Sequence, residues 1–163
     1  MYALGHIGIS LVLYAPIAAW YLQNGAVEMA LLGGVLMAAL GVLPDIDEYT
    51  ELIPHRGPTH TVWFAIAVGT VVGLTAWALT TVIGAVDPLG AAVQFGLLGS
   101  LAILGHLAGD IITPMGVWPF RPLSKWHYTF EITPAKNPAA NRLFFLVGIA
   151  SSCGIGTLFL LVL

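Results

Sequence analysis

Residues 88–110 read PLGAAVQFGLLGSLAILGHLAGD, and the only charged side chain among them is the last, Asp110. About 20 consecutive apolar residues are enough to cross a bilayer as a helix. Backbone groups inside hydrocarbon must bond within their own segment, so this stretch predicts a helix near 90–113. His106 lies four residues before Asp110, so both side chains should project from one face of that helix.

Four other runs share the pattern, with breakers such as Asn24-Gly25, Pro44 and Asp87-Pro88 between them. Hydrophobic residues make up 58% of the chain and charged residues 8%, whereas a soluble domain carries about 25% charged residues. Any single run could instead be a buried core helix. Together they predict an all-α, polytopic membrane helical bundle of about five transmembrane helices in one domain, 1–163, with the other helices near 4–23, 26–43, 59–84 and 140–162.

The basic residues predict the orientation. They fall after the second and fourth helices, and the loops after the first and third helices contain none; the five are Arg56, Arg121, Lys125, Lys136 and Arg142. By the positive-inside rule, the N-terminus and the second and fourth loops face the cytoplasm and the C-terminus lies outside. The net charge of -3 does not indicate the basic surface that nucleic-acid binding requires.

Histidines and aspartates from four separate segments fall on that same side of the predicted bundle. Imidazole and carboxylate together suit a divalent ion, and hydrolytic centres often pair two ions about 3.5–4 Å apart. We therefore expect one or two metal ions at one membrane face, zinc in the first instance and manganese as the alternative. The expected ligands are His6, Asp45, Asp47, His60, His106 and Asp110.

The expected ligands have structural alternatives. His6 could be an interfacial residue, Asp45 and Asp47 could be solvated loop carboxylates or helix caps, and His106 with Asp110 could form a structural pair.

The residues around them are also open to two interpretations. His55 could orient a ligand from outside the coordination sphere. The planar fork of Arg56 suits phosphate or carboxylate, but it could equally form an internal salt bridge to Asp45 or Asp47. Thr59 could cap the third helix or bond a ligand.

The segment 114–138 is long and proline-rich, and it mixes aromatic with basic residues such as Trp118, Arg121 and Trp126. That composition suits the headgroup layer. The segment could be a lid over substrate, but an interfacial anchor is the favoured interpretation. His127, within it, is a weaker ligand candidate.

A series of motifs in the chain resembles a known family. In order along the chain these are His6, Leu43-Pro44-Asp45-Ile46-Asp47, His55-Arg56-Gly57-Pro58-Thr59-His60, and Gly105-His106 with Asp110. In these motifs the chain resembles the YdjM-type membrane-bound metal-dependent hydrolases. These are also described as LexA-binding, inner-membrane-associated hydrolases. The resemblance implies an integral inner-membrane protein with a metal-dependent hydrolase site. It also implies a distant similarity to zinc-dependent phospholipase C, and hence phosphoester chemistry. Glu48 stands where the pattern leads us to expect a histidine.

These observations favour a membrane-bound metal-dependent hydrolase that acts at the cytoplasmic interface on a lipid or lipid-linked phosphoester. The expected catalytic residues are Asp47, which would accept a proton from the attacking water, Arg56, which would hold phosphate, and His55. The expected partners are membrane lipid and a small-molecule or lipid substrate. The alternatives are an ion or metal transporter and a non-catalytic membrane protein that binds a partner.

Overall fold

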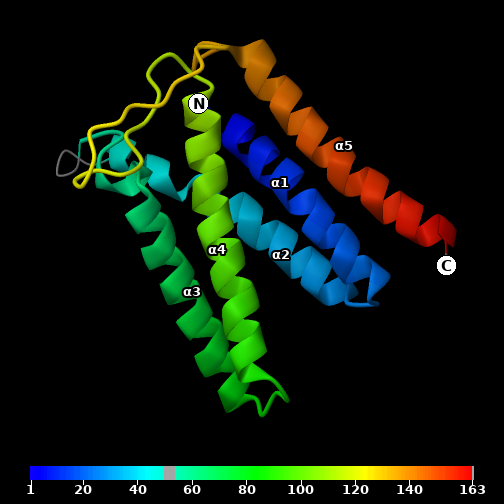
Figure 1. Cartoon of the computed structure of the whole chain (residues 1–163). Coiled ribbons are helices and arrows are strands. Elements are labelled where there is room, and N and C mark those ends of the chain that lie inside the picture. The colour runs from blue at the N-terminus through cyan, green and yellow to red at the C-terminus, as the bar shows by residue number, and fades with distance from the viewer. Residues whose placement is uncertain (50–53, 163) are drawn as a thin grey trace.

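Figure 1 shows the computed structural model of the chain, which describes residues 1–49 and 54–162. Within these residues there are five long helices and no β-strand, as predicted. The helices are α1 (Ala3–Gln23), α2 (Val27–Leu40), α3 (Val62–Val82), α4 (Pro88–Ile111) and α5 (Pro138–Val162). Two short 3-10 turns, η1 (Leu43–Tyr49) and η2 (Pro58–His60), lie between α2 and α3. All five helices, with η1 continuing α2, are long and apolar enough to cross a membrane.

Two helix ends differ from the sequence prediction. α2 ends at Leu40 rather than near residue 43, because the ring of Pro44 would clash with the Leu40 carbonyl in a continued helix. α3 begins at Val62 rather than near residue 59, because η2 intervenes and Thr61 is the N-cap. The Thr61 hydroxyl accepts a hydrogen bond from the Phe64 amide at 3.3 Å.

The helices pack as a row in which α1, α2 and α4 form the centre (Figure 1). α3 lies along α4 on one flank, and α5 lies along α1 on the other. Glycines allow the backbones of these flanking pairs to approach closely. A Cβ at Gly69 on α3 would lie 2.6 Å from the Gly96 carbonyl oxygen on α4, and one at Gly148 on α5 would lie 2.5 Å from the Gly8 carbonyl oxygen on α1.

The core between α1, α2 and α4 is apolar and includes Tyr14, Met37 and Ala102. Large apolar side chains also cover the outer faces of the helices. Val35 is 69% exposed and Leu97 66% exposed. An outer surface of this kind is suited to lipid rather than water, so the fold agrees with the apolar composition.

The start of α1, both 3-10 turns, the end of α4 and residues 112–137 gather at one end of the bundle (Figure 1). We call this the site end. Residues 112–137 are held there by backbone hydrogen bonds: Val117 and Tyr128 pair with each other at 3.0 Å, and the Ile132 amide donates to the Ile112 carbonyl at 2.8 Å.

Candidate metal centre

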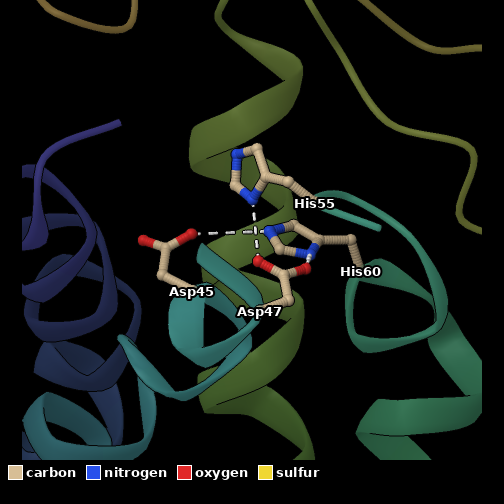
Figure 2. Close-up of side chains that lie close together, drawn as sticks. All are labelled: Asp45, Asp47, His55 and His60. Carbon is tan, nitrogen blue, oxygen red and sulfur yellow. Dashed lines mark hydrogen bonds and ion pairs between the residues drawn. The ribbon is translucent and has the colours of Figure 1, made fainter. Parts of the chain in front are cut away.

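All six predicted ligands meet at the site end. His6 comes from α1, Asp45 and Asp47 from η1, His60 from η2, and His106 and Asp110 from α4. Figure 2 shows Asp45, Asp47 and His55 around the His60 ring. The side chains of His6, His60, His106 and Asp110 are all fully buried. Three overlapping groups drawn from the six predicted ligands and His55 have donor atoms close enough together to hold a metal ion.

At the centre are two imidazole rings whose Nε2 atoms face each other. The Nε2 atoms of His60 and His106 are 3.1 Å apart. The His106 Nδ1 is 2.8 Å from the Gly41 carbonyl oxygen, which can only accept, so this nitrogen carries the hydrogen. In the neutral ring, the His106 Nε2 therefore presents a lone pair toward His60.

The hydrogen bonds around His60 place its ring hydrogen in the same way. The Thr59 hydroxyl donates its single hydrogen to Asp47 Oδ2 at 2.6 Å. It therefore faces the His60 Nδ1, 3.0 Å away, as an acceptor. Asp47 Oδ2, also an acceptor, lies 3.1 Å from the same nitrogen. The His60 Nδ1 thus carries the hydrogen, and in the neutral ring its Nε2 also presents a lone pair to the centre.

Two carboxylates complete the centre. Asp110 Oδ2 lies 3.3 Å from the His60 Nε2 and 3.5 Å from the His106 Nε2. Asp45 Oδ1 lies 3.5 and 3.3 Å from the same two nitrogens. Tetrahedral zinc with bonds of about 2.0–2.1 Å places neighbouring donors about 3.3–3.4 Å apart. The two imidazoles with either carboxylate therefore have the spacing of three ligands on one such ion.

His6 stacks on His106, with ring centroids 3.6 Å apart and planes 10° apart. Its Nε2 lies 3.8 Å from Asp45 Oδ2 and 3.7 Å from Asp110 Oδ1, the carboxylate oxygens that face away from the two central imidazoles. Among the described residues, neither ring nitrogen of His6 has a hydrogen-bond partner. A buried polar atom left in this state costs about 1–3 kcal/mol, which is the expected situation for a ligand to a cation.

Asp47 does not reach the central nitrogens but positions their neighbours. Its Oδ2 accepts from the Arg56 amide at 3.1 Å and from the Thr59 hydroxyl at 2.6 Å, and it lies 3.1 Å from the His60 Nδ1. Its Oδ1 contacts the His55 Nδ1 at 2.7 Å. A carboxylate that holds the far nitrogen of a ligating imidazole fixes the ring orientation and raises its basicity.

His55 lies at the open side of the centre. Its side chain is 34% exposed, and its Nε2 is 3.3 Å from Glu48 Oε1. Asp45 is 16% exposed on the same side, while the ligands from α1, η2 and α4 are fully covered. Solvent therefore has access to the centre past His55 and Asp45.

Arg56 forms an internal ion pair, but its partner is Asp110 rather than Asp45 or Asp47. Its Nη2 donates to Asp110 Oδ1 at 2.7 Å, and its Nη1 donates to the Gly116 carbonyl at 2.7 Å. The backbone of Arg56 adopts the left-handed conformation, with a φ of +58°, which is uncommon for residues other than glycine. These bonds hold the guanidinium against Asp110, and phosphate binding by Arg56 stays a prediction.

Competing effects act on the pKa of His60. Burial lowers it, whereas hydrogen bonds to Asp110 and Asp45 raise it, and the net direction is upward. A proton would therefore compete with any cation for the same nitrogen, since a histidine must be neutral to bind metal.

Several groups that hold the centre could not be recognised from sequence. The Gly41 carbonyl is free to accept from His106 because α2 ends there. The Thr113 hydroxyl accepts from the Arg56 Nη1 at 3.2 Å. The Met1 amino group lies 3.0 Å from Asp110 Oδ1. Backbone groups leave no signal in a residue pattern. Thr113 follows α4 and is not part of any recognisable motif.

The protein family described as YdjM inner membrane protein matches residues 1–163, the whole chain. No curated protein and no solved structure matches.

Proposed function

The chain belongs to the YdjM inner membrane protein family, and from this premise we propose that it is a membrane-bound metal-dependent hydrolase acting on a phosphoester. In this proposal His60, His106, Asp45 and Asp110 bind a divalent ion, zinc in the first instance. His6 contributes either to that ion or to a second one. The centre faces the cytoplasm, because the basic residues lie at the same end of the bundle.

One observation carries the proposal: two buried imidazoles are hydrogen-bonded at Nδ1, so that both Nε2 lone pairs converge across 3.1 Å between two carboxylates. Two lone pairs at this distance repel each other unless a proton or a cation lies between them. The two carboxylates beside them favour a metal cation over a proton, because a metal ion can bind several ligands at once.

A divalent ion bound there would supply a Lewis acid for the phosphoryl oxygen and lower the pKa of a water molecule. The chain supplies the proton acceptor. If the His55 Nδ1 donates to Asp47 Oδ1, its Nε2 can take a proton from the attacking water at the open side of the centre, and Glu48 Oε1, 3.3 Å away, would favour the protonated ring. Asp47 then orients His55 and stabilises its charged form.

Arg56 has a positioning role in this scheme. Its two Nη atoms bond within the site, and Nη2 holds Asp110 Oδ1. This contact leaves Asp110 Oδ2 directed at the two imidazoles. The substrate of the proposal is a lipid or lipid-linked phosphoester, because the centre lies at the end of a bundle whose outer surface is apolar.

Metal analysis of the protein purified in detergent without chelator tests the first half of the proposal. We expect the wild type to hold about one or two zinc or manganese ions, and His106→Ala and Asp45→Ala to lose them. His127→Ala is the matched control, because His127 is exposed and bonds only the Met115 carbonyl among the described residues.

Hydrolysis of phosphatidic acid, a monoester, and phosphatidylglycerol, a diester, tests the second half. We expect turnover of at least one that disappears in His106→Ala and falls strongly in His55→Ala. A wild type without metal contradicts the proposal. A metal-loaded wild type that hydrolyses neither lipid, with an ion closed off by protein ligands, would indicate a structural site instead.

The geometry does not favour a transporter. A carrier binds its ion near the middle of the bilayer, whereas all six predicted ligands gather at one end of the bundle.

A further inference from the structure

A groove of about 660 Å³ lies beside the metal centre, between the start of α3 and the segment that follows α4. Gly57 and Thr61, which flank the η2 turn of His60, contribute to its wall. Most of its lining is apolar, and the other lining residues include Pro58, Trp63, Phe64, Ala67, Arg121 and Pro122.

The two walls of the groove are joined by a backbone hydrogen bond. The Val62 amide, in the first turn of α3, donates to the Pro119 carbonyl at 2.9 Å. Phe64 packs against the buried residues Ala65, Ile103 and Leu107. Trp63 is 43% exposed on the outer surface of α3. The groove thus begins at the site end and extends along the apolar face of a membrane-spanning helix.

Arg121 places a positive charge at this groove. Its guanidinium carbon lies 4.4 Å from the centre of the Trp118 ring, a cation–π arrangement. Among the described residues its side chain forms no ion pair. Arg56, the other arginine at this end before α5, is buried and bonded to Asp110. Arg121 therefore presents a guanidinium at the groove that can meet an anion from outside.

We propose that this groove binds one anionic phospholipid, with an acyl chain along Trp63, Phe64 and Ala67 and the phosphate at Arg121. The apolar wall of the groove suits a hydrocarbon chain, and a guanidinium matches a phosphate through its fork of donors. A soluble phosphate would gain nothing from the apolar wall, and a neutral chain would gain nothing from Arg121. The lipid site goes beyond the proposed hydrolase activity and does not depend on the metal ligands.

Native mass spectrometry of the delipidated protein in detergent tests this inference with phosphatidylglycerol and phosphatidylcholine of identical chains. We expect tighter binding of phosphatidylglycerol. Arg121→Gln should reduce that preference about fivefold, the effect of one basic residue at a membrane surface. Ala67→Trp should weaken the binding of both lipids by filling the groove.

Each variant has a matched control. Lys125→Gln removes an exposed charge from the same segment, and Ala78→Trp adds the same bulk to α3 at an exposed position away from the groove. Equal losses in Arg121→Gln and Lys125→Gln, or in Ala67→Trp and Ala78→Trp, would overturn the site and indicate ordinary annular lipid. His106→Ala should keep the lipid preference while it loses metal, so the failure of one proposal is distinguishable from the failure of the other.

Discussion

His60 and His106 direct their Nε2 atoms at each other across 3.1 Å, although one belongs to a three-residue turn and the other to a 24-residue helix. The Gly41 carbonyl holds the far nitrogen of His106, and Asp47 with Thr59 holds that of His60. The two rings are therefore oriented from outside before any cation binds. Preorganised ligands of this kind lose little conformational freedom on binding.

Asp47→Asn should weaken metal binding without abolishing it. The amide keeps the shape of the carboxylate but removes the charge that holds the His60 Nδ1. Loss of such an outer contact lowers metal affinity about 10- to 100-fold. Competition with a fluorescent zinc chelator measures the change. An affinity equal to that of wild type would show that Asp47 does not position the ligand, and a complete loss would show that it is itself a ligand.

Gly109→Ala should disturb His6. A Cβ at this position would lie 2.9 Å from the His6 Nδ1, so the ring must shift from its stack on His106. Overpacking of this kind costs about 1–3 kcal/mol, and we expect a lower thermal midpoint and weaker metal binding. Gly34→Ala is the control, because its Cβ would make an ordinary contact 3.5 Å from Tyr14. Equal effects of the two variants would contradict a role for the His6 position.

Metal should stabilise the folded protein. An ion that binds only the native state raises the free energy of unfolding by about 2.7 kcal/mol when its concentration is about 100 times its dissociation constant. Zinc should therefore raise the thermal midpoint in detergent, and a chelator should lower it. The shift should be absent in His106→Ala and retained in His127→Ala. A shift of the same size in both variants would indicate non-specific binding to the surface.

Acid should weaken metal binding. The pKa of His60 is raised by its hydrogen bonds to Asp110 and Asp45, so a proton competes with zinc for the ligand nitrogen more strongly than on a free imidazole, and increasingly so as the pH falls. Zinc affinity should decrease steadily from about pH 7.5 to about pH 5.5, a range that brackets the ordinary histidine pKa. Equilibrium dialysis against buffered zinc measures this dependence. A constant affinity over that range would rule out histidine as a ligand.

The orientation can be tested with single cysteines in a Cys153→Ala background. Lys125 lies at the site end, and Val86 lies in the loop between α3 and α4 at the other end. A membrane-impermeant maleimide added to intact spheroplasts should label Val86→Cys and not Lys125→Cys. The reverse pattern would place the site end outside the cytoplasm.

The five helices, and the end of the bundle at which the polar residues meet, could be predicted from the residue pattern alone. Both follow from local properties: an apolar run of sufficient length must be helical in lipid, and an even number of crossings returns the chain to the same side. His6, Asp45, His60, His106 and Asp110 could be grouped in this way without any knowledge of their contacts.

The way in which these residues face one another depends on contacts between distant segments and could not be predicted in this way. Arg56 pairs with Asp110, 54 residues away, rather than with its nearer neighbours Asp45 and Asp47. Asp47 lies behind His60 instead of beside His106. Side-chain directions in η1, η2 and the following loop depend on contacts between segments distant in sequence, and the Gly41 carbonyl is a backbone group that no residue pattern records. The groove at Arg121 also depends on a contact between distant segments, because its two walls are joined by the hydrogen bond from the Val62 amide to the Pro119 carbonyl.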